Sequence, residues 1–306
     1  MNLREALSRA SQILIAANIE EARFESEVLL RHALNINRVQ LYQETGRALT
    51  PTEEEAFRQA IERRSRGEPT AYITGHREFY GLDFCTDSRA LIPRPESELL
   101  VEESLRFARE GRVSVLGDIG TGSGAIAISL ALNLPLVKVY ATDISPAALE
   151  LARINCQKHG LENRIALLCG DLLEVLPEPA DLITANLPYV RKSEIGNIPS
   201  AKFEPNLALD GGQNGLDQIF RLSRQVKGQL REGGCLLLEV GLGQSQSVSG
   251  LLKERFPLAE VKVIRDYSGI DRVVACIPVP HSSTGQPRTP AGDCHRLQIE
   301  THESRI

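Results

Sequence analysis

The sequence lacks several features that mark specialised classes of protein. No stretch comes near the roughly 20 uninterrupted apolar residues of a membrane-spanning helix. The N-terminus is charged at Arg4, Glu5 and Arg9, so we expect no signal peptide. Basic residues are not in surplus, because 35 Lys and Arg stand against 40 Asp and Glu. We therefore expect a cytoplasmic protein with no membrane partner and no direct nucleic-acid substrate.

Cysteine is sparse, and its six positions show no spacing typical of a metal site. Cys169 and Cys276 end the apolar runs LLC and VVAC. We interpret the cysteines as small buried side chains in a reducing compartment, and we predict no metal site. The six residues are Cys85, Cys156, Cys169, Cys235, Cys276 and Cys294.

The N-terminal quarter of the chain shows only helical patterns, and a length of 306 residues predicts two domains. Thr52 and Glu55 have the spacing of a capping box, which predicts the start of a helix. We interpret residues 1–75 as a small helical domain that either packs on the rest or recognises a partner. Residues 76–92 are richer in glycine and aromatic residues, as is typical of a hairpin or linker.

Residues 93–280 alternate short apolar runs with helical patterns, including a predicted helix over residues 96–110. This alternation predicts a parallel sheet with helices on both faces. The last two runs are joined only by YSGID, which is too short for a crossover helix, so that pair should be antiparallel. The candidate strands are VSVLGD, LVKVYATD, IALLCGD, DLITAN, GCLLLEVG, EVKVIRD and RVVACIPV.

The predicted fold class is therefore α/β. A seven-stranded, mostly parallel, doubly wound sheet stands beside a small all-helical N-terminal domain. Residues 281–306 are polar and rich in Ser, Thr, Pro and Gly, so we expect a disordered tail there.

The strongest local motif is Asp118-Ile119-Gly120-Thr121-Gly122-Ser123-Gly124, which directly follows the first strand and opens a helix. Glycines at this place let the backbone approach a ligand closely. The spacing is D-x-G-x-G-x-G rather than the G-x-G-x-x-G of dinucleotide folds. It favours the cofactor loop of S-adenosylmethionine-dependent methyltransferases.

Acidic residues end the next two strands. Asp143 is placed to accept the hydroxyl groups of a ribose. Asp171 is placed to accept the amine of an adenine, while Leu172 would pack on the ring. A plain Gly-Asp turn is the alternative for Asp171.

Asn186-Leu187-Pro188-Tyr189 follows the fourth strand and has the form (N/D)-x-P-(Y/F). An amide or an exocyclic amine is a poor nucleophile because its lone pair is delocalised. The Asn186 side-chain oxygen and a main-chain carbonyl near Pro188 could accept its two N–H groups and hold the nitrogen in line with a methyl sulfonium. Tyr189 would stack on the flat substrate group.

These residues closely resemble the peptide chain release factor N(5)-glutamine methyltransferases, the HemK/PrmC family, over nearly the whole chain to about Pro280. The more specific blocks lie before the first loop and after the second. They are Gly67-Glu68-Pro69, Ala71–Gly75, Glu78–Leu82, Leu91–Glu98, Glu204-Pro205, Ala208–Gly212 and Asp271–Val274.

The resemblance implies S-adenosyl-L-methionine as the cofactor and the glutamine of a Gly-Gly-Gln motif in release factors as the substrate. It also implies that the helical N-terminal domain helps to grip the protein substrate. The chain departs from the family at Leu187, where proline is usual. A ribosomal-protein glutamine, an adenine of rRNA or DNA, and a catalytically silent adenosine-binding module are the alternatives. Gly211-Gly212-Gln213 spells the substrate motif within the chain itself, and we interpret it as a turn.

Overall fold

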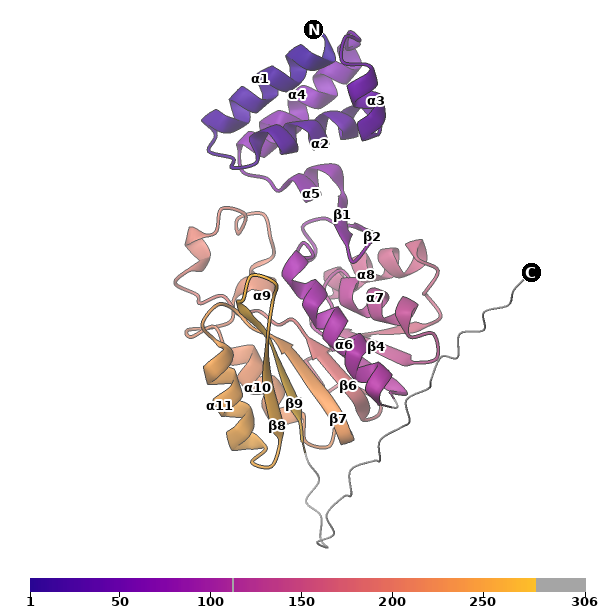
Figure 1. Cartoon of the computed structure of the whole chain (residues 1–306), viewed down its shortest axis with the longest axis vertical. Helices are drawn as coiled ribbons and strands as arrows, with labels where there is room; N and C mark the ends of the chain where they lie inside the picture. The colour runs from indigo at the N-terminus through magenta and orange to yellow at the C-terminus, as the bar shows by residue number, and fades with distance from the viewer. Residues whose placement is uncertain (112, 279–306) are drawn as a thin grey trace, which may run out of the picture.

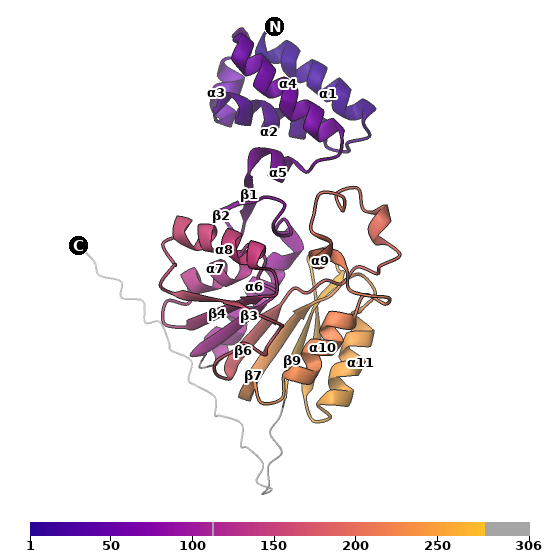
Figure 2. The same ribbon diagram turned by 180° about the vertical axis from the view of Figure 1, so that it is seen from behind.

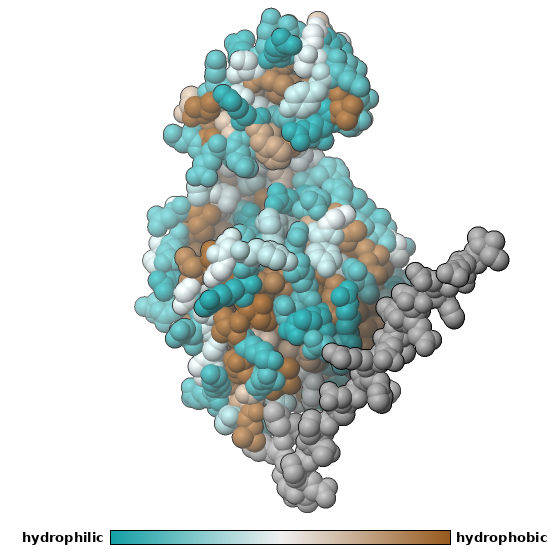
Figure 3. All heavy atoms as spheres, in the orientation of Figure 1, coloured by the Kyte–Doolittle hydropathy of each residue, from teal (hydrophilic) through white to brown (hydrophobic). Residues whose placement is uncertain are grey.

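The computed structural model describes residues 1–111 and 113–278. They form a small lobe and a larger lobe that are joined at a narrower neck (Figures 1 and 3). The small lobe consists of helices. These are α1 (Leu3–Ala16), α2 (Ala22–Leu34), α3 (Arg38–Gln43), α4 (Pro51–Ser65) and the short α5 (Thr70–Thr74).

Side-chain caps fix where these helices begin. Helix α4 starts at a capping box in which the Glu53 N–H donates to Thr50 Oγ1 and the Thr50 N–H donates to a Glu53 carboxylate oxygen. The predicted box of Thr52 and Glu55 is therefore wrong by two residues. The reason is Pro51, whose fixed φ suits the first helical position and which starts the helix earlier.

The small lobe has a hydrophobic core of its own. Leu3, Leu14, Leu29, Leu30 and Phe57 are among its buried members. This cluster is distinct from the two clusters that flank the sheet of the large lobe. The small lobe therefore does not need the sheet to bury its apolar residues.

The neck continues into a hairpin of β1 (His76–Phe79) and β2 (Leu82–Cys85), which pair antiparallel. Phe79 and Phe84 meet edge to face, with 6.1 Å between the ring centroids. Both rings are buried in a core cluster of the large lobe. The hairpin therefore packs with the sheet domain rather than with the helical lobe.

The described part of the large lobe contains a seven-stranded sheet in the order β5-β4-β3-β6-β7-β9-β8. All neighbouring strands are parallel except those that pair with β9, which runs antiparallel to both β7 and β8. This confirms the predicted fold, including the reversed strand. The strands are β3 (Val115–Ile119), β4 (Lys138–Asp143), β5 (Ile165–Cys169), β6 (Ala180–Ala185), β7 (Leu230–Glu239), β8 (Glu260–Arg265) and β9 (Asp271–Ile277).

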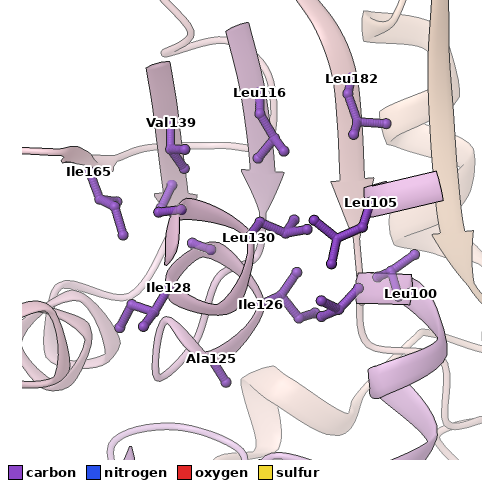
Figure 4. Close-up of a cluster of buried hydrophobic side chains, with 14 of the residues drawn as sticks. Leu100, Leu105, Leu116, Ala125, Ile126, Ile128, Leu130, Val139, Ile165 and Leu182 are labelled. Atoms are coloured by element: carbon purple, nitrogen blue, oxygen red, sulfur yellow. The ribbon is translucent and has the colours of Figure 1, made fainter. Parts of the chain in front are cut away.

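Helices cover both faces of the sheet because buried side chains alternate along each strand. Leu116, Val139 and Leu182 point to α6 (Glu98–Glu110) and α7 (Ala125–Asn133), as Figure 4 shows. Helix α8 (Pro146–Lys158) lies on the same face through Cys156. On the other face, α10 (Asp217–Gln225) and α11 (Ser245–Arg255) pack on a second cluster (Figure 2).

The cysteine prediction holds for Cys156, Cys235 and Cys276, which are buried and free. It is wrong for Cys169, which is exposed because it ends β5, the strand at one edge of the sheet. The predicted disordered tail over residues 281–306 lies outside the described residues. No helix in the described part of the chain is long and apolar enough to span a membrane.

Candidate active site

A cavity lies at the carboxyl ends of β3, β4, β5 and β6, where the strand order reverses between β3 and β6. This is where open parallel sheets bind ligands. Four strand-end loops line it together with the hairpin, the segment before α6 and parts of the chain between β6 and β7. The lining residues used below are Ala90, Arg94, Ser97, Gly120, Thr121, Gly122, Ser123, Asp143, Asp171, Leu172, Asn186, Leu187, Pro188 and Arg221.

The glycine loop after β3 is anchored to the end of β4. The N–H groups of Gly120 and Thr121 each donate to the Thr142 carbonyl at 2.9 Å, and the Gly122 N–H donates to Asp143 Oδ2 at 2.9 Å. Gly120 and Gly122 both have positive φ. A Cβ at Gly120 would lie 3.0 Å from Leu187 Cδ2, so the glycine there leaves room for the neighbouring loop.

Asp118 and Gly124 are not among the residues that line the cavity, and their part in cofactor binding stays a prediction. Asp118 is 1% exposed and accepts hydrogen bonds from the hydroxyls of Thr121, at 2.7 Å, and Thr184, at 3.1 Å. Burial raises the pKa of Asp118 to about 6, and these two hydroxyls offset part of the rise. Asp118 therefore supports the loop from beneath, while Gly124 begins α7 with positive φ.

Asp143 faces the cavity from the end of β4. Its Oδ1 accepts the Ser145 N–H and its Oδ2 accepts the Gly122 N–H, both at 2.9 Å. Burial raises the pKa of Asp143, and the same two N–H groups act against that rise. A carboxylate has about four acceptor sites, so two remain for a ligand in the cavity.

Asp171 and Leu172 also line the cavity, and their contacts with an adenine stay a prediction. Asp171 forms an ion pair with Arg221 from α10, a partner that the sequence reading missed. Leu172 is buried with φ +52, and its carbonyl accepts the Thr142 hydroxyl at 3.0 Å. An adenine edge at this position would therefore meet a carboxylate and a guanidinium together.

Asn186 reaches the cavity from the loop after β6. Its Nδ2 donates to Ser97 Oγ at 2.9 Å. This bond engages the NH₂ side of the planar amide group, so Oδ1 on the opposite side of the group remains as an acceptor. Leu187 and Pro188 line the cavity beside it, although the Leu187 side chain is 3% exposed and belongs to the core.

Tyr189 is not among the residues that line the cavity, and its stacking on a substrate stays a prediction. Its carbonyl accepts the side-chain N–H of Gln244 at 3.0 Å. Burial raises the pKa of the Tyr189 hydroxyl to about 12, and the negative charge of Glu239 adds to the rise.

The turn that contains Gly211 packs directly on this loop. The Gly211 N–H donates to the Val190 carbonyl at 2.9 Å. A Cβ at Gly211 would lie 2.7 Å from the Pro188 carbonyl oxygen and 2.8 Å from Tyr189 Cα. The glycine is therefore needed because two backbones approach closely, which agrees with the turn interpretation of Gly211-Gly212-Gln213.

Two further residues near the cavity were not assigned from the sequence. Arg94 lines the cavity, and its Nη2 donates to both carboxylate oxygens of Glu204 at 2.6 and 2.7 Å. Ser97 lines it as the acceptor for Asn186. The blocks Leu91–Glu98 and Glu204-Pro205 were the available signal, since they carried the family resemblance without an assigned role.

Comparisons with known proteins agree with this geometry. The model of the PrmC N-terminal domain matches residues 5–75, and a methyltransferase-domain model matches residues 112–262. The release factor glutamine methyltransferase of Moorella thermoacetica is 43% identical over 274 residues, covering 89% of this chain and 97% of that protein. The corresponding protein of Koribacter versatilis is 42% identical over 280 residues, covering 90% and 98%.

Solved structures match the fold of the sheet domain. A methyltransferase from Pyrococcus furiosus has a TM-score of 0.51 and 21% identity, covering 66% of this chain and 91% of that one. The sequence relatives are far closer and extend over both lobes. The predicted family is thereby confirmed, and the chain belongs to the release factor glutamine methyltransferases.

Proposed function

We propose that this protein transfers a methyl group from S-adenosylmethionine to the side-chain amide nitrogen of the glutamine in the Gly-Gly-Gln motif of release factors. The observation that carries the proposal is the orientation of Asn186. Its amide nitrogen is held by Ser97, so that its oxygen can serve as an acceptor in the cavity that also contains Gly122 and Asp143. The names of the curated relatives support the choice of substrate.

The cavity suits an adenosine cofactor. Gly120 and Gly122 allow a backbone approach, Asp143 has acceptor capacity for ribose hydroxyls, and Leu172 offers an apolar side chain. When bound, S-adenosylmethionine supplies a methyl group on a positively charged sulfur that needs no further activation. The chain must therefore position the nucleophile rather than activate the methyl donor.

The loop after β6 would perform that positioning. A glutamine amide presents two N–H donors, and Asn186 Oδ1 together with the Pro188 carbonyl could accept them. Acceptors directed at these hydrogens favour the departure of the nitrogen from planarity, which frees its lone pair for attack. Because the alkylated amide loses its proton readily to water, no protein base is required.

We further propose that the enzyme acts in the cytoplasm on a protein and not on nucleic acid. The excess of acidic over basic residues supports this choice. A ribosomal-protein glutamine and an adenine amine present a similar flat, delocalised nitrogen to the same loop. These two substrates are therefore separate arms of the experiment.

Single-turnover methyl transfer to a purified release factor tests the proposal, with a ribosomal protein and naked rRNA in parallel. We expect transfer to the release factor alone. Asn186→Ala should lower the rate by roughly a hundred- to a thousandfold, as for other oriented catalytic hydrogen bonds. Cofactor affinity, measured by calorimetry, should change far less.

Asn133→Ala serves as the matched control, because Asn133 lies at the end of α7 and does not line the cavity. It should keep the wild-type rate. A near-normal rate for Asn186→Ala would remove the loop from the mechanism, and transfer to rRNA would overturn the choice of substrate.

A further inference from the structure

Polar side chains from α10 line the β5 end of the cavity. The cavity follows four strand ends in the order β5, β4, β3 and β6, with Asp171 after β5 and Asn186 after β6. Asp143, the acceptor proposed for the ribose, ends β4 between them. Gln218 and Arg221 of α10 line the cavity as well. The proposed function gives these two residues no part so far.

Hydrogen bonds hold the Arg221 guanidinium beside Asp171. Its Nη2 donates to Asp171 Oδ2, and its Nη1 donates to the side-chain oxygen of Gln218 at 2.9 Å. Helix α10 is itself tied to the segment after β5, because the Leu173 N–H donates to Gln225 Oε1 at 2.9 Å. The guanidinium therefore has a defined position at the wall of the cavity, set by contacts between two separate elements.

Stability alone is a weak reason for this pair. The side chain of Arg221 is 46% exposed and that of Asp171 is 25% exposed. Ion pairs with this much contact with water contribute little to folding. Both side chains line the cavity in which the cofactor is expected, rather than an outer face of the molecule. A role in ligand binding therefore accounts better for their position.

The pair has hydrogen-bonding capacity to spare. A carboxylate has about four acceptor sites, and the bond from Arg221 uses one of those of Asp171. A guanidinium has five N–H groups, and the bonds to Asp171 and Gln218 use two of them. A ligand at this wall therefore meets an acceptor next to a donor.

This pattern complements the edge of an adenine. The 6-amino group of adenine is a donor, and it stands between two ring nitrogens, N1 and N7, that are acceptors. A base with a carbonyl oxygen at position 6 presents an acceptor there instead, which a carboxylate repels. The sequence motifs supplied only Asp171 for the amine, so the partner for a ring nitrogen was missing.

We propose that Arg221 reads the adenine of the cofactor together with Asp171. The carboxylate accepts from the amine, and the guanidinium donates to the ring nitrogen beside it. The inference rests on the proposed function in one respect, since it takes the adenine to lie at β5 when the methyl group lies at Asn186. It adds a specificity-determining contact from a helix outside the strand-end motifs.

Arg221→Met tests the claim, because methionine keeps an unbranched side chain and removes every donor. The measurement is calorimetric titration of the whole chain with S-adenosylhomocysteine, the product form of the cofactor, so that no methyl transfer is needed. Three analogues of this ligand each change one group of the base. One carries a carbonyl in place of the amine, and the other two lack N7 or N1.

The wild type should bind S-adenosylhomocysteine roughly ten- to a hundredfold more tightly than the carbonyl analogue. It should also discriminate against one of the two analogues that lack a ring nitrogen, by on the order of tenfold. Asp171→Asn should narrow the preference over the carbonyl analogue, because a side-chain amide can donate to that oxygen.

Arg221→Met should weaken binding of S-adenosylhomocysteine on the order of tenfold. It should cause almost no further loss for the analogue that lacks the contacted nitrogen, since the partner of Arg221 is already absent there. If Arg221 only held Asp171 or α10 in place, binding of both ring-nitrogen analogues would weaken by the same factor as that of S-adenosylhomocysteine. The comparison therefore separates a direct contact from a structural role.

Arg224→Met is the matched control. Arg224 lies three residues further along α10, and its guanidinium stands over the Phe220 ring, 4.4 Å from the centroid. It is not among the described residues that line the cavity. All four ligands should bind this variant as they bind the wild type. The thermal midpoints of Arg221→Met and Arg224→Met should both stay close to that of the wild type.

The outcomes separate the two claims. A wild type that shows the expected preferences but does not methylate a release factor overturns the proposed function and leaves this inference standing. An Arg221→Met variant with normal affinity, or with equal losses for S-adenosylhomocysteine and both ring-nitrogen analogues, overturns this inference alone. So does a wild type that binds both of those analogues as tightly as S-adenosylhomocysteine, a result that does not depend on the folding of any variant.

Discussion

At the scale of single residues, two buried carboxylates near the site are held in different ways. Asp118 has two threonine hydroxyls as partners, and burial raises its pKa to about 6. Glu239 retains a buried oxygen without a partner among the described residues, and burial raises its pKa to about 7. In both residues burial is the largest cause of the raised pKa.

The raised pKa of Glu239 predicts a pH-dependent contribution to stability. Its folded value of about 7 lies above the ordinary value of 4.5, so the folded chain binds a proton more tightly than the unfolded chain between these values. Ionisation in that window therefore costs folding free energy, and the cost is complete above about pH 7. Relative to that of the wild type, the free energy of unfolding of Glu239→Gln should therefore rise by on the order of 3 kcal/mol between acid and neutral pH.

Denaturant unfolding at a series of pH values measures this difference, whatever constant offset the substitution introduces. Glu53→Gln is a control of opposite sign, because hydrogen bonds from Thr50 and Arg47 lower the pKa of Glu53. The wild type should have a larger free energy of unfolding than Glu53→Gln at pH values above the ordinary pKa of glutamate. This difference should fade as the pH falls. If the difference in free energy of unfolding between Glu239→Gln and the wild type does not change between pH 4.5 and pH 7, the raised pKa of Glu239 is contradicted.

At the scale of elements, an ion pair joins two segments that flank the cavity. Arg94 precedes the short helix before α6, and Glu204 lies in the long connection after β6. The Glu204 side chain is 0% exposed, whereas that of Arg94 is 34% exposed. Both Glu204 oxygens depend on one guanidinium nitrogen, so this pair holds the two segments together.

Removing the arginine should therefore be costly. Arg94→Ala leaves a buried carboxylate without its partner, and we expect the free energy of unfolding to fall by about 3 kcal/mol. Arg191→Ala is the control from the same connection, because the Arg191–Glu194 pair is more than half exposed on both sides. It should change stability by less than about 1 kcal/mol. Equal effects of the two substitutions in denaturant unfolding would show that burial of Glu204 does not matter.

The sheet was predictable from the sequence because its signal is local. Strands such as DLITA and GCLLLEV are short apolar runs between helical patterns, and the short link YSGID forces an antiparallel pair. The Asn186 loop and Asp143 could be proposed as site residues because both directly follow such runs. Their place in one cavity follows from the parallel order of the strands.

The remaining parts of the site depend on contacts that no local pattern encodes. Arg94 and Glu204 are 110 residues apart, and Ser97 and Asn186 are 89 apart. The carbonyl of Tyr189 likewise accepts from Gln244, which is 55 residues away. Cys169 was misplaced because the strand order, not the apolar run, decides which strand forms an edge.

At the scale of the whole molecule, the two lobes have separate cores and few polar links. Tyr72 Oη donates to the Ala90 carbonyl at 2.7 Å, and Lys202 Nζ donates to the Arg66 carbonyl at 2.6 Å. Both links end beside the site, since Ala90 lines the cavity and Lys202 belongs to the same connection as Glu204. The helical lobe thus connects to the sheet domain beside the cavity, which is where we propose that a protein substrate arrives. Figure 1 shows the lobe at one end of the sheet domain.

This arrangement predicts a division of labour between the lobes. A chain that begins at His76 keeps the hairpin, the sheet and every cavity-lining residue, and it loses a lobe whose core is its own. We expect it to bind S-adenosylmethionine with nearly unchanged affinity and to methylate a short Gly-Gly-Gln peptide at the rate of the full chain. Methyl transfer to an intact release factor should fall sharply, because the surface that grips the protein is gone. Calorimetry and single-turnover assays on both substrates measure the two effects.

If the shortened chain methylates the intact factor at the full rate, the helical lobe has no part in recognition. If the shortened chain no longer binds the cofactor, the sheet domain depends on the helical lobe for its stability.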